Sequence, residues 1–387
     1  MSGSSRVFVA AWEYPPILSG ESVVCRRTLE HSALDYDVCC GPVEARGDGH
    51  IRLFPRGGNK YLLWPFAAAR CFRELDRTED YRVMMSRVMP PNGHLAGWLI
   101  KRMKPSLRWV VYFSDPIWNS PFLRLLPGRR GDHRPKWLLM KLFGIPAKWA
   151  VREGDLLVFN NERLARYVLG KRYARYRDKV LIAPYGHEGV KPRPPAERGD
   201  GKLRLTHVGQ LYGNRTLEAL LGGLTLLKER SPELYRRLAV RQVGFASERE
   251  RKRAAASPAG ELVEFAGQVP YGESIEEMYR ADWLLVIDPV FDDPRKNIYI
   301  PGKLYDYLST GRPILCIAAE DSATGDAAKQ AGLLRCAPTA EQVYTALRTV
   351  LEGTISEIVL HGFEEMRIHT GIETLDHRMK ELSFYEG

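Results

Sequence analysis

The residue types most suited to chemistry in this chain lie between Tyr299 and Ala318, in YIPGKLYDYLSTGRPILCIA. Pro301 and Gly302 predict a tight loop that leads directly into a helix. The start of a helix leaves backbone N–H groups unpaired and carries a partial positive charge, so it suits a phosphate group. Lys303 adds a cation at that end. Asp306, one turn later, is placed to accept hydrogen bonds from ribose hydroxyls.

The elements that position these residues follow from the same stretch. Apolar residues at helical spacing predict a helix from Lys303 to Thr310. It ends at Gly311, because Pro313 cannot continue it, and Ile314 to Ala318 is then a short buried strand. The alternative is an ordinary helix and strand whose lysine and aspartate are merely solvated.

Other candidate residues follow predicted strands. A strand from Leu203 to Val208 leads into the loop Gly209 to Arg215, which contains Tyr212 and ends in a cation. At the other end of the chain, a strand from Arg6 to Trp12 leads through a loop into a helix from Glu21 to His31. Ligands of doubly wound sheets bind at the carboxyl ends of strands. We therefore expect Gly20, Glu21 and Ser22 to face a ligand. The alternative is that Gly20 only serves the turn.

Asp115 is a further candidate of the same kind. It follows the predicted strand Trp109 to Phe113, and a carboxylate at this position suits ligand binding or proton transfer. The alternative is an aspartate that caps the following turn.

Composition describes an ordinary globular protein with a basic balance. Of its 387 residues, 44% are hydrophobic and 27% charged, and the formal net charge is +10. This charge favours an anionic partner, such as nucleotide phosphates, nucleic acid or an acidic membrane. The six cysteines show no CxxC spacing and are expected to be reduced core residues. Without a signal peptide or a run of about 18 apolar residues, a cytoplasmic location is expected.

The segment from Pro121 to Arg152 is strongly basic and interleaved with Trp, Phe and Leu. Such a composition suits the anionic surface of a membrane, so peripheral attachment at the inner face of the plasma membrane is expected. The alternative is a core helix with a solvated charged face. The residues expected at the acceptor or the membrane are Arg129, Arg130, Lys136, Trp137 and Lys141.

The chain divides into two α/β halves. Residues 1–186 predict one Rossmann-like domain, the Pro- and Gly-rich residues 187–201 a linker, and residues 202–365 a second Rossmann-like domain. Residues 366–387 are expected to form a C-terminal helix that returns to the first domain. Two doubly wound domains facing across a cleft are therefore expected.

The second half resembles the nucleotide-sugar half of GT-B glycosyltransferases, specifically the retaining enzymes of glycosyltransferase family four. The blocks that carry the resemblance are THVGQLYGNRTLEALLGGL from Thr206, VEFAGQVPYGESIEEMYRADWLLVID from Val263 and PGKLYDYLSTGRPIL from Pro301. In the first half, Gly20 and APYGHE from Ala183 are similar to the family's glycine loop and hinge.

The resemblance implies roles for individual residues. Arg215, Lys303 and the Pro301–Gly302 backbone would contact the donor diphosphate, and Asp306 would hold the ribose. Val269 would lie beside the base, and Asp115 near the reacting sugar. Its implied donor-binding residues are Gly20, Glu21, Ser22, Gly209, Tyr212, Arg215, Val269, Pro301, Gly302, Lys303 and Asp306.

Two positions depart from the family pattern: Gln210 stands where an arginine is usual, and Ile298 where the first acid of a glutamate pair is usual. The resemblance implies sugar transfer with retention, from a nucleoside-diphosphate sugar to a saccharide hydroxyl. Arg215 and Lys303 would stabilise the departing diphosphate without a metal or other cofactor, and Asp115 would position or activate the acceptor.

Asp292 and Asp293 lack the DxD spacing of a metal site and, with Asp288 and Arg295 nearby, are expected on a surface loop.

Other functions are alternatives to glycosyl transfer. A basic nucleic-acid-binding protein is one, but no nucleic-acid-binding motif accompanies the charge. A sugar-nucleotide epimerase with the same two-domain build is a second alternative. A soluble natural-product acceptor is the alternative to a polyprenyl-linked saccharide.

Overall fold

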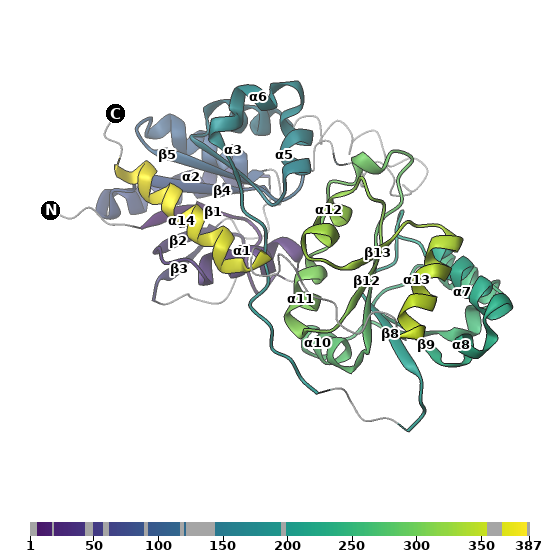
Figure 1. Ribbon diagram of the computed structural model, residues 1–387. Helices are drawn as coiled ribbons and strands as arrows, with labels where there is room; N and C mark the ends of the chain where they lie inside the picture. Colours follow the sequence, from purple (N-terminus) through teal and green to yellow (C-terminus); the bar gives the residue numbers. More distant parts are fainter. Residues whose placement is uncertain are drawn as a thin grey trace. The chain divides into compact units, whose positions relative to one another are not determined.

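The chain forms two compact units. The computed structural model describes residues 6–17, 19–42, 49–56, 62–88, 92–116, 120, 144–194, 199–353 and 366–384. Unit 1 comprises residues 1–186 and 368–387, and unit 2 residues 187–367 (Figure 1). The last helix is thus part of the first unit, although the whole of unit 2 separates it from the rest of that unit in sequence.

Unit 1 is built on a seven-stranded parallel sheet with the order β3-β2-β1-β4-β5-β6-β7. This is the strand order of a doubly wound sheet: β2 and β3 lie on one side of β1, and β4 to β7 lie on the other. The strands are β1 (Val7–Ala10), β2 (Tyr36–Cys40), β3 (Ile51–Pro55), β4 (Val83–Arg87), β5 (Arg108–Phe113), β6 (Leu156–Phe159) and β7 (Val180–Ile182).

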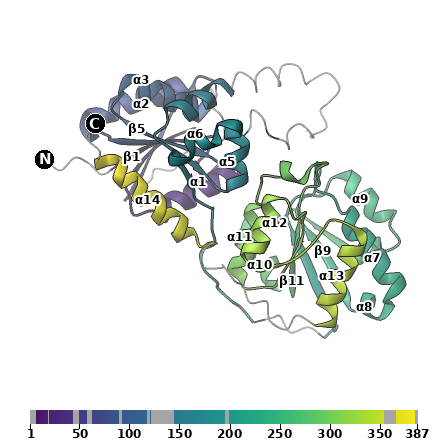
Figure 2. The same cartoon turned by 45° about the horizontal axis from the view of Figure 1, so that its top comes forward.

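Helices cover both faces of this sheet. Helices α1 and α14 lie on one face and α2 and α3 on the other (Figure 2). The helices are α1 (Gly20–Glu30), α2 (Trp64–Glu79), α3 (Asn92–Met103), residues 144–153, α5 (Glu162–Leu169), α6 (Tyr173–Tyr176) and α14 (Ile368–Phe384), with 3-10 turns at Gly170–Arg172 and Arg177–Lys179.

Unit 2 repeats the design with a six-stranded parallel sheet in the order β10-β9-β8-β11-β12-β13. Its strands are β8 (Leu203–Val208), β9 (Leu238–Val243), β10 (Val263–Gly267), β11 (Trp283–Ile287), β12 (Ile314–Ile317) and β13 (Leu334–Cys336). Its helices are α7 (Glu218–Arg230), α8 (Pro232–Arg236), α9 (Glu248–Ala255), α10 (Tyr271–Arg280), α11 (Gly302–Thr310), α12 (Ala323–Gln330) and α13 (Ala340–Glu352), with 3-10 turns at Gly260–Leu262 and Pro294–Lys296.

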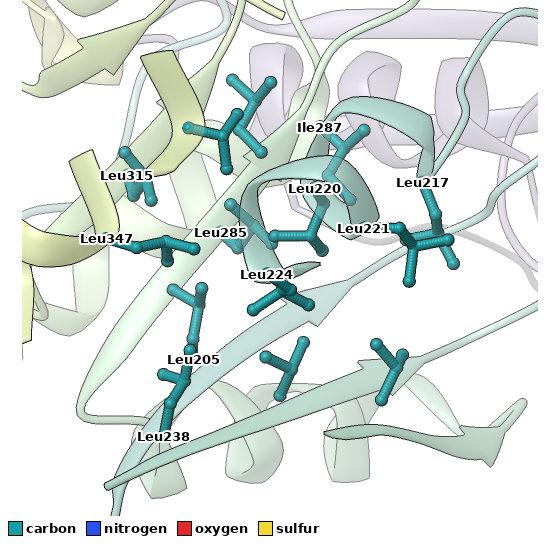
Figure 3. Packing of buried hydrophobic residues seen from close by; sticks show 14 of the residues in the cluster. Leu205, Leu217, Leu220, Leu221, Leu224, Leu238, Leu285, Ile287, Leu315 and Leu347 are labelled. Carbon is teal, nitrogen blue, oxygen red and sulfur yellow. The ribbon is translucent and has the colours of Figure 1, made fainter. Parts of the chain in front are cut away.

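Leucines dominate the core of unit 2. Helices α7 and α13 pack on one face of the sheet, where Leu220, Leu224 and Leu347 meet Leu205 and Leu285 of the central strands (Figure 3). Each of these five side chains is almost completely buried. Such burial is the main source of stability for a layer of helices on a sheet.

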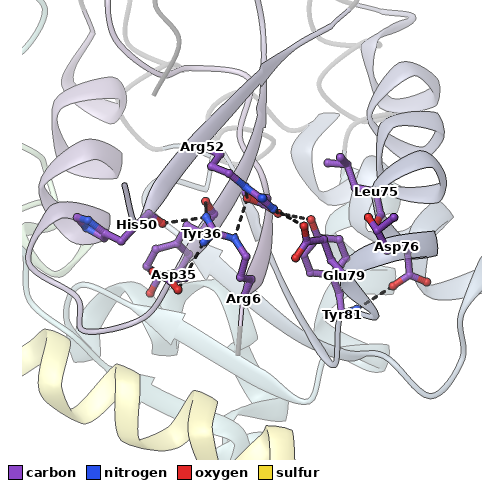
Figure 4. Close-up of polar contacts among 11 residues, drawn as sticks. Arg6, Asp35, Tyr36, His50, Arg52, Leu75, Asp76, Glu79 and Tyr81 are labelled. Atoms are coloured by element: carbon purple, nitrogen blue, oxygen red, sulfur yellow. Dashed lines mark hydrogen bonds and ion pairs between the residues drawn. The ribbon is translucent and has the colours of Figure 1, made fainter. Parts of the chain in front are cut away.

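A buried carboxylate joins strands and a helix in unit 1. Asp37 of β2 accepts hydrogen bonds from Arg6, Arg52 and Tyr81, and Arg52 also pairs with Glu79 at the end of α2 (Figure 4). Burial alone would raise the pKa of Asp37, but the bonds from Arg52 and Tyr81 hold it below its usual value. The network fixes one edge of the sheet to α2.

The doubly wound α/β class predicted from the sequence is confirmed in both units. The predicted strand Leu203 to Val208 has the same bounds in the structure. All six cysteines are buried and unpaired, as expected. The strand β3 was not predicted because it is only partly buried beyond its first residue. No helix within the described ranges is long and apolar enough to cross a membrane.

Candidate functional site

The start of α11 lies at the carboxyl edge of the unit 2 sheet. Pro301 occupies the position before the helix in extended conformation, and no side chain caps the helix. Gly302 is its first residue, and a Cβ added there would meet no atom within 4 Å. The open space and uncapped helix start are the features that bind anions at helix N-termini.

Lys303 reaches from this helix to the loop after β8. A Cβ built on Gly209 would lie only 1.4 Å from Lys303 Nζ. A larger residue at position 209 would therefore displace the Lys303 ammonium group from its place. The resemblance assigned both residues to the donor site, and the structure brings them into contact.

Backbone hydrogen bonds hold three loops together at this edge. The Gly209 amide bonds to Val243 O at 2.7 Å, and the Leu211 amide to Phe245 O at 2.7 Å. The Gly244 amide bonds to Gly267 O at 2.6 Å. The loops after β8, β9 and β10 thus form one surface beside α11.

A buried histidine–glutamine pair supports this surface from inside unit 2. Gln242 donates from Nε2 to Gly209 O at 2.7 Å, so its Oε1 faces the buried His207. His207 Nδ1 therefore donates to this oxygen, at 2.5 Å. Burial, followed by the nearby charge of Lys303, keeps the pKa of His207 well below its usual value, so the ring is neutral.

Two cations, Lys303 and Arg215, lie close enough here to repel each other. Desolvation of the ammonium group, followed by repulsion from Arg215, lowers the pKa of Lys303 to about 7, and Asp306 opposes the shift. Arg215 Nη1 donates to Gln210 O at 3.4 Å. An anionic ligand between Arg215 and Lys303 would remove this repulsion.

Tyr307 fixes α11 on the sheet and was not singled out from the sequence. Its buried hydroxyl accepts the Val208 amide at 2.7 Å, and lies 3.2 Å from Val208 O and 3.3 Å from Leu285 O. The available signal was its position four residues after Lys303 on the predicted helix. Helical spacing alone did not distinguish a hydrogen-bonding tyrosine from one that only packs in the core.

Asp288 is buried, whereas Asp292 in the following loop is exposed, as expected of a surface loop. Its carboxylate accepts hydrogen bonds from Thr324 at 2.7 Å, Asn297 at 2.5 Å and Ser322 at 3.3 Å. Burial raises its pKa to about 7, against the effect of these bonds. The network ties the loop before α11 to the start of α12, because Ala323 N also bonds to Asn297 O at 2.8 Å.

In unit 1, the corresponding strand ends hold a buried ion pair. Arg87, at the end of β4, donates from Nε to Glu21 at 2.7 Å, and its guanidinium group lies 4.0 Å from the centre of the Tyr112 ring. Ser19 caps α1 by accepting from Ser22 N at 3.0 Å. The Glu21 side chain is therefore engaged within its own unit, where it positions the start of α1.

Comparison with solved structures agrees with the two-unit architecture. No protein-family model and no curated protein matches the chain. A trehalose-6-phosphate synthase, whose structure concerns glycosyl transfer with retention, aligns with a TM-score of 0.64 at 13% identity over 98% of this chain and 99% of that one. A glycosyltransferase from Rickettsia africae aligns with a TM-score of 0.63 at 10% identity over all of both chains. WaaG, a glycosyltransferase of lipopolysaccharide biosynthesis, gives 0.62 at 15% identity over 97% and 99%.

This chain has the GT-B fold. The edge formed by the loops after β8 to β10 and the start of α11 belongs to unit 2, the second of its two Rossmann-like units. Lys303, Arg215, Gly209 and Asp306, to which the resemblance implied roles, all belong to this edge.

Other residues implied by the resemblance lie around the same GT-B unit. Val269 is half-buried in the loop after β10, and Tyr212 is half-buried in the loop after β8. Ile298, at the position of the missing acid, is buried. It therefore offers no polar contact, and Asp306 is left as the nearest carboxylate on α11.

The predicted unit 1 positions follow β1 and β5. Asp115 is half-buried two residues beyond the end of β5. A Cβ added to Gly20 would meet no atom within 4 Å, so packing does not require a glycine there. The expected acceptor and membrane residues Arg129, Arg130, Lys136, Trp137 and Lys141 lie outside the described residues.

Proposed function

We propose that this protein is a retaining glycosyltransferase that uses a nucleoside-diphosphate sugar. The observation that carries the proposal is the pair of mutually repelling cations, Arg215 and Lys303, beside an uncapped helix start. A diphosphate would supply negative charge to both cations, and the open space at Gly302 admits it. A structural neighbour, trehalose-6-phosphate synthase from E. coli, is solved with UDP-2-fluoro glucose bound.

In the proposed reaction, the bond from the anomeric carbon to the diphosphate oxygen breaks as negative charge develops on the leaving group. Arg215, Lys303 and the amides at the start of α11 stabilise that charge, in the place where another enzyme would use a metal. The acceptor oxygen bonds to the anomeric carbon on the same face. Its proton passes to the departing diphosphate, and Asp115 orients the acceptor hydroxyl.

We also propose that the acceptor is a lipid-linked saccharide of cell-surface polysaccharide or glycolipid assembly, met at the cytoplasmic side of an anionic membrane. Support comes from the basic, Trp-bearing segment around Trp137 and from the net charge of +10. A structural neighbour, WaaG, is involved in lipopolysaccharide biosynthesis.

Substitution of the two cations tests the donor site. A thermal-shift screen of UDP, GDP and ADP first identifies the nucleotide, because a bound ligand stabilises the fold. Lys303→Ala and Arg215→Ala are then expected to lower the rate of nucleotide release from the matching sugar donor by about 100-fold or more. Gly209→Ala is expected to act similarly, because its Cβ displaces Lys303 Nζ while both charges remain.

The matched control is Arg236→Ala, which removes an exposed arginine of α8 in the same unit. Circular dichroism and thermal melting establish that each variant is folded. If folded Lys303→Ala and Arg215→Ala variants transfer sugar as fast as the parent, the proposed function is wrong.

A further inference from the structure

The outward face of α2 carries a continuous line of exposed side chains. Leu63, Phe66, Arg70, Arg73 and Arg77 follow one another at intervals of three and four residues, which places them on one face of the helix. We call these five residues the α2 stripe. Its first part is apolar and the remainder is cationic over a length of about 21 Å.

The stripe is accessible to a partner. Phe66 is 58% exposed and Leu63 59%, and the adjacent Leu62 is 60% exposed. These three are among the most exposed large apolar side chains in the described part of the chain. Side chains of this size seldom gather on a surface unless it contacts a partner.

The arginines of the stripe are only partly neutralised. Arg70 pairs with Glu74 at 3.2 Å, but Glu74 is shared with Arg56 at 3.3 Å. Within the described ranges, Arg73 and Arg77 form no ion pair. The face therefore keeps a net positive charge next to its apolar end.

The apolar end is held rigidly. Trp64, which opens α2, is fully buried, donates from Nε1 to Cys40 O at 3.1 Å and packs edge-on against Trp12. Phe66 therefore projects from a fixed helix start. Beside the stripe, a groove of about 730 Å³ runs between α2 and α3, with Arg102 and Met103 on its far wall.

Unit 1 as a whole also carries a positive net charge. Unit 1 contains 33 lysines and arginines against 21 aspartates and glutamates, a net charge of +12. Unit 2 contains 24 against 26, a net charge of −2. The positive field of the protein therefore belongs to the unit that carries the α2 stripe.

We propose that the α2 stripe docks on an anionic phospholipid surface, with Leu62, Leu63 and Phe66 entering the interface and the arginines reaching lipid phosphates. The lengthwise separation of apolar and cationic parts suits a planar surface that offers both acyl chains and phosphates. An acidic protein segment would match the arginines but leave the apolar end exposed. The inference rests on the proposed membrane-borne acceptor and names the surface that approaches it.

Vesicle sedimentation tests the proposal on the full chain, with phosphatidylcholine vesicles that contain or lack phosphatidylglycerol. The parent is expected to bind only the anionic vesicles. The triple variant Arg70→Gln, Arg73→Gln, Arg77→Gln is expected to bind about 100-fold more weakly at low salt, at about five-fold for each charge. Leu63→Ser with Phe66→Ser is expected to remove the binding that persists at high salt, where charge is screened.

The control triple variant is Arg236→Gln, Lys252→Gln, Arg348→Gln, which removes the same charge from exposed sites of unit 2. It is expected to bind like the parent. Equal loss in this control, parent-like binding by the stripe variants, or no binding by the parent would overturn the proposal. So would ultracentrifugation showing that the stripe variants instead dissociate a dimer.

The outcomes also separate this inference from the proposed function. Nucleotide release to water or a soluble acceptor is expected to be unchanged in the stripe variants, since α2 lies in the unit that does not contain Arg215 and Lys303. Loss of vesicle binding with this activity retained supports the docking surface. Absence of nucleotide binding in the parent would count against the transferase instead.

Discussion

At the scale of single residues, the informative feature is the unfavourable placement of two cations, Lys303 and Arg215, near each other. Lys303 is desolvated beside Arg215, which lowers its pKa to about 7, and its ammonium group lies where a Cβ at position 209 would be. Strongly shifted pKa values of this kind cluster at functional sites. His207 is kept neutral next to these cations, so it adds no further positive charge.

This arrangement predicts a pH dependence of ligand binding. Above about pH 7 the free protein has lost the Lys303 proton, and a bound diphosphate restores it, so binding takes up a proton. The dissociation constant of the nucleoside diphosphate is therefore expected to rise by up to about ten-fold per pH unit between about pH 7 and about pH 9. Titration calorimetry in buffers of different ionisation enthalpy measures both the constant and the proton.

Lys303→Arg is the control, because an arginine stays charged throughout this range. It is expected to show no proton uptake. A parent protein whose affinity is constant from about pH 7 to about pH 9 would contradict the assignment.

At the scale of elements, two contacts determine where α11 begins. Tyr307 joins the helix to β8 and β11, and the Asp288 network joins the preceding loop to α12. Asp288 is a buried acid whose pKa is raised to about 7. It therefore links the geometry of the donor site to the stability of unit 2.

The raised pKa fixes the sign of a stability change. Between about pH 4 and about pH 7 the folded state keeps a proton on Asp288 that the unfolded chain has released, so stability falls as pH rises. A decrease of about 1 kcal/mol per pH unit is expected for the unfolding of unit 2. Asp288→Asn, which mimics the protonated acid, is expected to reduce this decrease.

Urea denaturation at about pH 5, 6, 7 and 8 measures the effect. The control is Asp292→Asn, the same change at an exposed carboxylate in the same loop. Identical pH profiles for the parent and Asp288→Asn would show that the raised pKa is wrong.

At the scale of the whole molecule, the chain returns to unit 1 after completing unit 2. Helix α14 buries Leu375 and Met379 on the unit 1 sheet. Asp376 accepts from the Ser32 hydroxyl and from the Ala33 amide, both at 2.7 Å, across 344 and 343 residues of sequence. Such a connection makes the stability of unit 1 depend on the last residues of the chain.

Asp376→Ala is therefore expected to destabilise unit 1 by about 1–3 kcal/mol, because it leaves the Ala33 amide unpaired in a partly buried position. Glu373→Ala, one turn earlier on the exposed side of α14, is expected to have little effect. Thermal melting of the two variants checks this. Equal melting temperatures would show that the C-terminal contact contributes little.

The sequence by itself determined the class of fold and most element positions. Buried apolar runs with glycine and proline at their ends are local signals, so strands such as Leu203 to Val208 were predicted with the observed bounds. The loop and helix at Pro301, Gly302 and Lys303 were likewise evident, because the features that start a helix are adjacent in the chain.

Only the tertiary structure decided which of these residues meet. Lys303 approaches Gly209 because β8 lies between β9 and β11 in the sheet, an order that local patterns do not encode. The buried contacts of Asp288 were not predicted, because Ser322 and Thr324 come from the start of a separate helix and Asn297 lies nine residues further along the same loop. The exposed line of Leu63, Phe66 and the arginines also became evident only when packing had buried the opposite face of α2. The periodicity of apolar residues predicts which side chains are buried, but only the folded structure shows which residues they contact.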